Sequence, residues 1–320
     1  MKPKVYITRK LPSKIVQRLE NVCEVKMWAE EDVPVPREVL LREIRDVDGL
    51  LCMLTETIDE EMIRYGQNLH IIANMAVGYN NIDVIAATKR GVIVTNTPGV
   101  LTETTADLTF ALLMATARRI VEASEYIQNG QWKSWSPMQL VGQDVYGATI
   151  GFIGMGRIAE AVVKRAKGFD MNVLYYNRSQ KPDLEQKYNM QFVELKTLLK
   201  EPDFVCILIP YSPDVHHLIG ERELALMKES AILINTARGG IVDEKALFEA
   251  LQRKTILAAG LDVFEEEPVS LENPLLTLPN VVALPHIGSS SEKTRLRMAE
   301  LAADNIKGVL YGNGPLTSVN

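Results

Sequence analysis

The chain has 320 residues, with 35 Lys and Arg against 41 Asp and Glu, and its formal net charge of −6 argues against a generally basic nucleic-acid-binding surface. The 47% hydrophobic and 24% charged shares are those of a soluble globular protein and exclude a disordered chain. Because the length exceeds what one hydrophobic core usually serves, we expect two domains, with one large α/β domain as the alternative.

The cysteines and the lack of export or membrane signals predict a cytoplasmic protein. Cys23, Cys52 and Cys206 are odd in number, widely spaced and set among apolar residues, which favours reduced, buried thiols over disulfides or metal ligands. The first residues show no signal-peptide pattern. The most apolar helical stretch, 110–117, is far shorter than the roughly 18 residues of a membrane span.

Short apolar runs alternate with polar helical stretches in the first part of the chain. The runs are residues 5–8, 49–54, 70–75 and 92–95, with helical stretches such as 14–20 and 60–65 between them. This alternation predicts a parallel sheet covered by helices on both faces. The loop Thr97-Pro98-Gly99 then breaks the pattern, and one long amphipathic helix is expected over about 101–128. We expect a domain boundary at this loop.

A second series of apolar runs lies at 149–153, 173–176, 204–209, 231–234, 257–261 and 281–284. Six such runs predict a full doubly wound sheet. The final segment opens with a capping box over Ser289–Glu292 and predicts a helix that returns to the first domain. The fold class expected is α/β, with two Rossmann-like domains of doubly wound parallel sheets and a cleft between them. One domain comprises residues 1–99 and 288–320, and the other residues 100–287.

The segment 151–159 has the pattern of a dinucleotide-binding turn. It follows an apolar run, leads into a helical pattern and presents G-x-G-x-x-A on Gly154, Gly156 and Ala159. Gly154 permits a tight turn, Gly156 lets a pyrophosphate approach the backbone, and Ala159 allows the helix to pack closely on the strand. The phosphates would meet the positive end of the helix. Because the motif alone is weak evidence, a turn that binds no nucleotide is the alternative.

The end of the next strand predicts which nucleotide is bound. NAD-binding proteins place an acidic residue there for the ribose 2′-hydroxyl, but this strand ends in Asn177-Arg178-Ser179. An arginine with neutral neighbours can hold a 2′-phosphate through charge-assisted hydrogen bonds. We therefore predict a preference for NADP and leave the use of NAD open. The alternative is that Arg178 is only a solvated loop residue.

Polar signatures follow three apolar runs of the second series. Arg238 lies in the motif N-T-A-R-G-G, Glu267 ends an acidic run, and His286 lies in P-H-I-G. Since the carboxyl ends of parallel strands meet at the edge where open α/β sheets bind ligands, these side chains should face one cleft with the glycine turn. The glycines beside Arg238 are typical of a place where a ligand approaches closely.

Each of these three residues also has an ordinary structural interpretation. Arg238 could form a surface salt bridge, acidic runs such as 265–267 are usually solvated, and a histidine at a strand end is often structural. The position of His286 beside the expected cleft favours catalysis. No spacing of Cys and His resembles a zinc site, so no metal is expected.

Several motifs occur in order along nearly the whole chain: M-A-V-G-Y-N-N-I-D at 75–83, the glycine turn at 154, N-T-A-R-G at 235–239, G-L-D-V at 260–263, E-P at 267–268 and L-P-H-I-G at 284–288. With them the chain resembles the D-2-hydroxyacid dehydrogenases, most closely the glyoxylate and hydroxypyruvate reductase branch. Two departures from the commonest family pattern, Ala159 and the pair Asn177-Arg178, concern only the choice of cofactor.

The resemblance implies a role for each motif. It implies that Arg238, Glu267 and His286 are catalytic, and that the backbone of Val77 and Gly78 holds the substrate carboxylate with Arg238 and His286. It further implies a substrate-binding, flavodoxin-like first domain, an NAD(P)-binding Rossmann second domain, and a homodimer built partly from the helix after Leu101, with Trp132 and Trp135 nearby. Asp262 would face the nicotinamide carboxamide, and the other cofactor contacts are expected at Gly154, Gly156, Arg157, Ile158, Asn177, Arg178, Ser179, Pro210, Thr236, Ala237 and Gly288.

The activity that follows is NADPH-dependent reduction of a small 2-keto acid to a D-2-hydroxy acid. Arg238 is expected to pair with the substrate carboxylate and polarise the keto oxygen, while His286, oriented and kept charged by Glu267, donates a proton. The alternatives are a gluconate 2-, D-lactate or D-3-phosphoglycerate dehydrogenase, or a nucleotide-sensing corepressor scaffold. Nucleic acid and membrane are not expected as partners. The sequence leaves the specific keto acid open.

Overall fold

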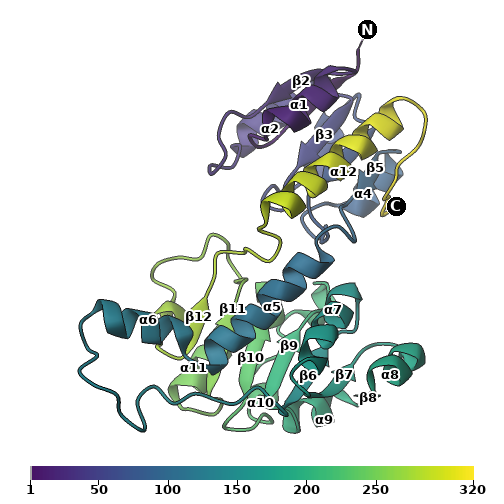
Figure 1. Cartoon of the computed structure of the whole chain (residues 1–320). Coiled ribbons are helices and arrows are strands. Elements are labelled where there is room, and N and C mark those ends of the chain that lie inside the picture. The colour runs from purple at the N-terminus through teal and green to yellow at the C-terminus, as the bar shows by residue number, and fades with distance from the viewer. Residues whose placement is uncertain (1) are drawn as a thin grey trace. The chain divides into compact units, whose positions relative to one another are not determined.

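A computed structural model describes residues 2–320, and the chain divides into two compact units (Figure 1). The first unit runs to Leu101 and includes the final segment Ser290–Asn320, and the second unit is Thr102–Ser289. Each unit has its own parallel sheet with helices connecting the strands. The predicted α/β fold class with two parallel sheets is therefore confirmed.

The sheet of the first unit has five parallel strands in the order β2-β1-β3-β4-β5. This is one of the two common doubly wound orders. The central strands β3 and β4 are buried along their whole length, as expected where helices cover both faces. The last helix, α12, packs against β3 and β4. The elements are β1 (Lys4–Ile7), α1 (Ser13–Glu20), β2 (Glu24–Met27), α2 (Arg37–Glu43), the 3-10 helix η1 (Ile44–Asp46), β3 (Gly49–Cys52), α3 (Glu60–Tyr65), β4 (Ile71–Asn74), α4 (Val84–Lys89), β5 (Ile93–Thr95) and α12 (Glu292–Leu310).

The sheet of the second unit has seven parallel strands in the order β12-β11-β10-β9-β6-β7-β8. The order reverses beside β6, and such switch points are where open α/β sheets bind ligands, outside the carboxyl ends of the strands. The elements are α5 (Thr102–Ala117), α6 (Ile120–Gln128), β6 (Thr149–Ile153), α7 (Arg157–Lys167), β7 (Asn172–Tyr176), α8 (Pro182–Tyr188), β8 (Met190–Phe192), α9 (Leu195–Lys200), β9 (Phe204–Ile207), η2 (Pro213–Val215), α10 (Glu221–Leu224), β10 (Ile232–Asn235), η3 (Gly239–Ile241), α11 (Glu244–Gln252), β11 (Ala258–Leu261), η4 (Pro274–Thr277) and β12 (Val281–Ala283).

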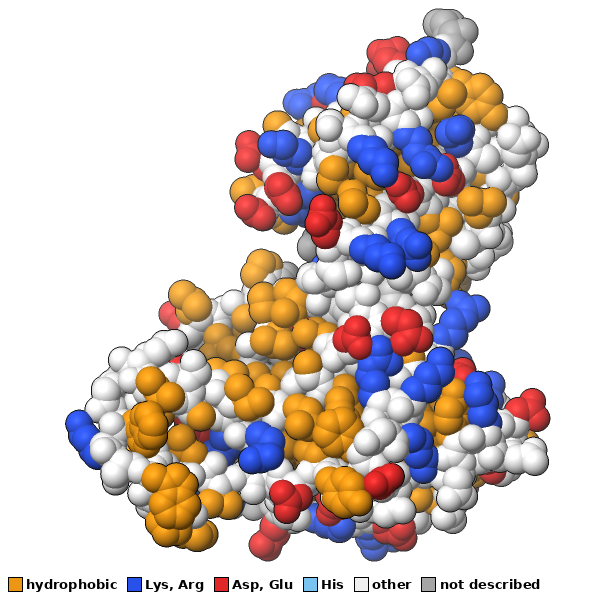
Figure 2. All heavy atoms as spheres, in the orientation of Figure 1, with side chains coloured by type: hydrophobic (Ala, Val, Ile, Leu, Met, Phe, Trp, Pro, Cys, Tyr) orange, Lys and Arg blue, Asp and Glu red, His pale blue; other side chains and the backbone are white. Residues whose placement is uncertain are grey.

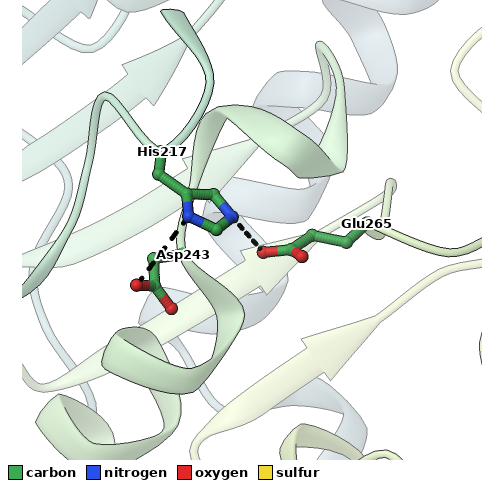
Figure 3. A group of neighbouring side chains, drawn as sticks. All are labelled: His217, Asp243 and Glu265. Atoms are coloured by element: carbon green, nitrogen blue, oxygen red, sulfur yellow. Dashed lines mark hydrogen bonds and ion pairs between the residues drawn. The ribbon is translucent and has the colours of Figure 1, made fainter.

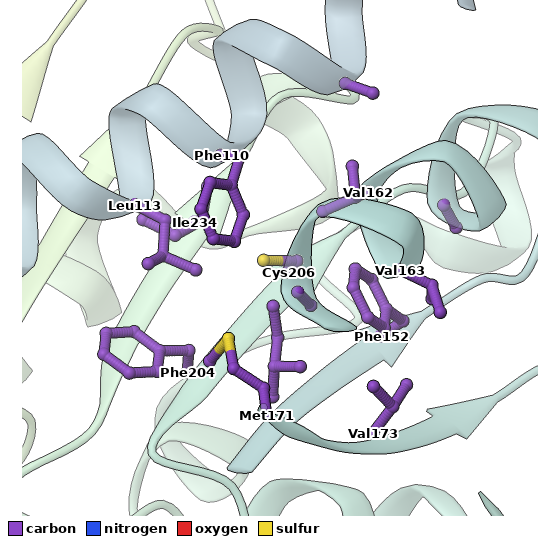
Figure 4. Packing of buried hydrophobic residues seen from close by; sticks show 14 of the residues in the cluster. Phe110, Leu113, Phe152, Val162, Val163, Met171, Val173, Phe204, Cys206 and Ile234 are labelled. Atoms are coloured by element: carbon purple, nitrogen blue, oxygen red, sulfur yellow. The ribbon is translucent and has the colours of Figure 1, made fainter. Parts of the chain in front are cut away.

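Two apolar cores hold the second sheet, one on each face. Helices α5 and α7 contribute Phe110, Leu113 and Val162 to one core, where they pack on Phe152 of β6 (Figure 4). Residues of α9, α10 and α11 cover the other face. Because successive strand residues alternate between the two faces, both sides of the central strands are apolar. The sheet edge that carries the polar loops is thus held by a rigid scaffold.

The structure corrects three details of the sequence analysis. The edge strands β2 and β8 were not predicted. The single helix expected over 101–128 is two helices, α5 and α6, separated where Arg119 adopts a left-handed conformation with φ of 52°. The capping box predicted from Ser289 is also displaced, since the side chain of Ser291 accepts the hydrogen bond from Thr294 N and Glu292 is the first helical residue.

The cysteines lie in the interior, as predicted. Cys23, Cys52 and Cys206 are all buried and none is in a disulfide. Burial raises the pKa of Cys52 and Cys206, so both stay as neutral thiols. Among the helices of residues 2–320, none combines the length and apolar character needed to cross a bilayer.

Candidate active site

The glycine turn between β6 and α7 has the geometry that a nucleotide turn requires. Gly154 has φ of +98°, and a Cβ there would lie 2.6 Å from Cγ2 of Ile209 and 2.8 Å from the carbonyl oxygen of Leu208. Only glycine fits this place. Gly156 begins α7 as its N-cap, and a Cβ on it would meet nothing within 4 Å. The backbone therefore lies open where Arg157 and Ile158 form the first turn of the helix.

The loop after β7 is held by its own polar groups. Asn177 accepts a hydrogen bond from Met155 N at 3.4 Å and donates one to the carbonyl oxygen of Ser179 at 2.8 Å. The side chain of Arg178 is exposed and has no hydrogen bond or ion pair with any residue in 2–320. The loop thus ties the neighbouring strand end to the glycine turn and presents a cation that is available for an anionic ligand.

The catalytic candidates of the second unit follow three adjacent strands. In the sheet, Asn235 of β10 is level with Leu261 of β11, and Leu261 is level with Ala283 of β12. The loops that carry Arg238, Glu267 and His286 therefore leave the same edge of the sheet.

His286 and Glu267 form a hydrogen-bonded pair. Nδ1 of His286 lies 2.6 Å from Oε2 of Glu267, and the two side chains are 24% and 26% exposed. The other carboxylate oxygen accepts a hydrogen bond from Phe264 N at 3.1 Å. Burial alone would raise the pKa of Glu267, but the hydrogen bond and charge of His286 outweigh it, and the pKa lies below its ordinary value. With Nδ1 engaged, Nε2 is the ring nitrogen that can exchange a proton with a ligand.

Arg238 lies close to this pair. Its Nη1 donates to the carbonyl oxygen of Ala237 at 2.7 Å, and its own carbonyl accepts from Nδ2 of Asn235 at 2.9 Å. Burial lowers the pKa of the Arg238 guanidinium, and the nearby Glu267 carboxylate opposes that shift. An arginine so placed remains a cation at neutral pH and can bind a carboxylate through two parallel hydrogen bonds.

The glycines after Arg238 serve packing within the protein. A Cβ on Gly239 would lie 1.8 Å from the carbonyl carbon of Phe264, so the loop after β10 presses directly on the backbone of the loop after β11. A Cβ on Gly240 would lie 3.1 Å from Cε2 of the Tyr211 ring. The sequence analysis explained these glycines by the close approach of a ligand. The structure shows that the close approach is that of another loop.

Asp262 has a structural task that the sequence analysis missed. It is 1% exposed, and its two carboxylate oxygens accept hydrogen bonds from Ile287 N at 2.7 Å and Gly288 N at 2.8 Å. Burial raises its pKa, against the effect of these bonds and of His286. These two bonds hold the turn in which His286 has φ of 52°. The signal in the sequence was an acidic residue directly after one apolar run, with the motif P-H-I-G after the next run.

Three further candidate positions of the second unit follow β9 and β10. Thr236 shares a hydrogen bond of 2.8 Å with Thr109 of α5, a buried hydroxyl that the sequence analysis did not single out. Ala237 is half-buried beside it, and Pro210 is exposed after β9. The strand order reverses between β9 and β6, and β10 is the next strand beyond β9.

Val77 and Gly78 belong to the first unit, in the turn after β4. Nδ2 of Asn96 donates to the carbonyl oxygen of Val77 at 2.8 Å, and Nδ2 of Asn74 donates to that of Gly78 at 2.9 Å. Within residues 2–320, the N–H groups of Val77 and Gly78 donate to no acceptor. Paired backbone donors of this kind suit a carboxylate. The two asparagines were not predicted, although each lies at the end of an apolar run.

Comparisons with known proteins show the family of the chain. The family model of the D-isomer specific 2-hydroxyacid dehydrogenase, NAD binding domain, matches residues 110–288. A glyoxylate reductase from Pyrococcus horikoshii is 51% identical over 324 residues, covering 100% of this chain and 96% of that protein. A solved Thermus thermophilus structure superposes with a TM-score of 0.93 at 45% identity, covering 99% of this chain and 100% of that one.

A third relative was solved with ligands bound. It is an NADPH-dependent glyoxylate/hydroxypyruvate reductase from Sinorhizobium meliloti, in complex with NADP and malonate. It superposes with a TM-score of 0.86 at 32% identity and covers 100% of this chain and 97% of that one. With both sheets, the glycine turn and the full-length identity in agreement, the chain belongs to the family of D-isomer-specific 2-hydroxyacid dehydrogenases and is an NAD(P)-dependent oxidoreductase.

Proposed function

We propose that this enzyme reduces glyoxylate to glycolate, and hydroxypyruvate to the D-2-hydroxy acid, with NADPH as the hydride donor. The observation that carries the proposal is the hydrogen-bonded pair of His286 and Glu267 close to Arg238, on loops that leave one edge of the nucleotide-binding sheet. Relatives named glyoxylate reductase, about half identical over the whole chain, support the choice of substrate.

The two units have distinct proposed roles. Residues 100–287 would bind the cofactor, and residues 1–99 with 288–320 would contribute the backbone of Val77 and Gly78 to the substrate carboxylate. The donor N–H groups of that turn support this assignment. The open backbone at Gly156 and the exposed cation at Arg178 fit a nucleotide with a 2′-phosphate.

In the proposed mechanism the protein orients the keto acid and supplies its proton. Arg238 would pair with the substrate carboxylate and polarise the keto group, so that negative charge builds up on the keto oxygen. Nε2 of His286 would donate a proton to that oxygen as negative charge develops on it, and would take the proton back in the reverse reaction. Glu267, held by Phe264 N, would keep the ring oriented and charged through Nδ1. The nicotinamide, when bound, supplies the hydride, and Asp262 would lie beside its carboxamide.

Replacing Arg178 tests the preference for NADPH. Arg178→Gln should lower kcat/KM with NADPH about tenfold or more, the value of one charge-assisted hydrogen bond, and should leave kcat/KM with NADH nearly unchanged. Initial rates with both cofactors measure the ratio. The control is Arg222→Gln, an exposed arginine on α10. Equal use of both cofactors by the unmodified enzyme would refute the preference.

We also propose that the enzyme is a homodimer in the cytoplasm. Helix α6 and the segment after it expose large apolar side chains: Ile120, Val121, Ile127, Trp132, Trp135, Met138, Val141 and Tyr146. Figure 2 shows hydrophobic side chains, in orange, on the surface of the second unit. Trp135 alone is 79% exposed. An apolar surface of this extent suits a second copy of the chain. The three free buried cysteines suit a reducing compartment.

Sedimentation equilibrium measures the assembly. The mass expected is twice the 35.7 kDa of the chain. Replacing Trp132 and Trp135 together with Ser should shift the equilibrium toward the monomer, whereas Leu271→Ser, a 92% exposed residue outside this segment, should leave it unchanged. A monomeric unmodified protein at micromolar concentration would contradict the proposal.

A further inference from the structure

His217 connects three loops at the edge of the second sheet (Figure 3). It lies in the loop after β9, and its backbone N–H donates to the carbonyl oxygen of Gly240 at 2.9 Å, two residues after Arg238. Its Nε2 lies 2.9 Å from Oε1 of Glu265, two residues before Glu267. One residue therefore ties the loop after β9 to the loops that carry two of the proposed catalytic side chains.

Glu265 also forms hydrogen bonds with Glu244, the first residue of α11. Its Oε1 also accepts a hydrogen bond from Glu244 N at 3.1 Å, and its own N–H donates to Oε1 of Glu244 at 2.6 Å. The other oxygen of Glu244 accepts from Nδ2 of Asn273 at 2.8 Å. The loop after β11 is thus anchored on its outer side by His217 and by a helix end.

The ring of His217 lies between two carboxylates. Asp243 lies on the opposite side of the ring, with its Oδ2 3.9 Å from Nδ1, while its Oδ1 caps α11 through Ala246 N. The two carboxylates therefore face different ring nitrogens. One ligand atom from each of the three side chains lies within 4.8 Å of the others, but each carboxylate faces a different ring nitrogen, and a metal ion would bind only one of those nitrogens.

The loops after β10 and β11, which lie between His217 and the pair of Glu267 and His286, pack closely against each other. Gly239 lies so close to Phe264 that a Cβ would be 1.8 Å from its carbonyl carbon. The N–H of Phe264 in turn donates to Oε1 of Glu267, whose other oxygen holds His286. A displacement of Glu265 would consequently reach the carboxylate that orients His286.

His217 also has a left-handed backbone, with φ of 52°. A residue other than glycine in this region costs energy and persists where its contacts hold it. Here the contacts are the bond to Gly240 and the pair with Glu265.

We propose that His217 and Glu265 are positioning residues for the reaction, which set Glu267 against His286 from outside the active site. The inference rests on the proposed function, because it assigns these residues to the same acid. Neither residue would touch the substrate or the cofactor.

The decisive variant is His217→Asn. Asparagine accepts the left-handed backbone readily, so the substitution removes the pair with Glu265 at little cost to the fold. We expect kcat/KM with glyoxylate to fall about tenfold or more, up to the roughly 10²-fold that a misplacement of 1 Å costs. The KM for NADPH should not change. The upper pH limit of the reductive activity should move to lower pH, because a displaced Glu267 carboxylate stabilises the protonated imidazole of His286 less.

Three comparisons make the test specific. Glu265→Gln should reproduce both effects, and the double variant should be no worse than either single one, because both changes disrupt the same contact. Glu266→Gln should have no effect, since Glu266 is exposed and makes no hydrogen bond or ion pair within residues 2–320. A purely structural role would lower Tm and leave the pH profile in place.

A readout without turnover separates this inference from the proposed function. NMR titration of the labelled imidazole of His286, identified by its loss in His286→Asn, should show a lower midpoint in both single variants. An unchanged midpoint and unchanged pH profile would overturn the inference, even for an enzyme that reduces glyoxylate rapidly. A lowered midpoint in an enzyme that reduces no keto acid would support the positioning role and refute the proposed substrate.

Discussion

Replacement of His286 by Asn should lower kcat for glyoxylate reduction about 10²- to 10⁴-fold, the contribution of a positioned general acid. Asn is preferred to Ala because His286 has φ of 52°, a conformation that asparagine tolerates. The hydrogen bonds that Ile287 N and Gly288 N donate to Asp262 should persist, so the turn after residue 286 keeps its conformation. Binding of NADPH, followed by fluorescence titration, should be nearly unchanged.

The matched variant is Glu267→Gln, which keeps the shape of the carboxylate and removes its charge. The pKa of Glu267 lies below its ordinary value, so the group is an anion throughout the neutral range. Loss of that anion disfavours the protonated ring, and the upper pH limit of the reductive activity should move to lower pH. Full activity of His286→Asn, or an unchanged pH profile of Glu267→Gln, would rule out this acid.

Replacement of Arg238 by Lys should lower kcat/KM for glyoxylate about 10- to 10²-fold. The charge is kept, but the planar pair of donors that fits a carboxylate is lost, and a hydrogen bond to a charged group contributes about 1.5–3 kcal/mol. Steady-state kinetics with glyoxylate and NADPH measure the effect, which should fall on kcat/KM for the keto acid and spare the KM for NADPH.

A control for the arginine exists at the end of α11. Arg253, the residue after this helix, pairs with Glu249 of α11 on the protein surface, and Arg253→Lys should change no kinetic constant. If Arg238→Lys behaved in the same way, the guanidinium would not bind the substrate carboxylate, and the proposed orientation of the keto acid would be wrong.

The sequence predicts the central strands well and the edges of the sheets poorly. The central strands are buried on both faces and appear as continuous apolar runs. The edge strand β2 (Glu24–Met27) instead alternates between exposed and half-buried residues, and the edge strand β8 has only three residues. Strands this short and polar have the same pattern as loops. Their pairing to β1 and β7 is a long-range event that local sequence does not record.

The break between α5 and α6 has a similar origin. The sequence around Ala117 and Arg119 contains neither Gly nor Pro. In the structure the carbonyl oxygen of Ala117 accepts a hydrogen bond from Gln143 N at 2.8 Å, and Gly142 packs so closely that a Cβ would lie 2.2 Å from that oxygen. A distant segment thus takes the acceptor that a continuous helix would use.

In the site, too, the sequence predicts features that depend on neighbouring residues and misses contacts between distant segments. That Arg238, Glu267 and His286 leave one sheet edge could be predicted, because each follows an apolar run of a parallel sheet. Contacts between loops could not, and they decide how the side chains are held. The packing of Gly239 on Phe264 and the bridge from His217 to Glu265 depend on the three-dimensional path of loops far apart in sequence.

The central claim is tested most directly by the initial rate of NADPH oxidation, followed by absorbance, with glyoxylate as substrate. Hydroxypyruvate, pyruvate, 2-ketogluconate and 3-phosphohydroxypyruvate are measured in parallel, and the product of glyoxylate reduction is identified as glycolate. We expect rapid turnover of glyoxylate and hydroxypyruvate, with NADPH preferred over NADH. Tight binding of NADPH without oxidation by any keto acid would contradict the proposed reductase function and favour a nucleotide-sensing scaffold.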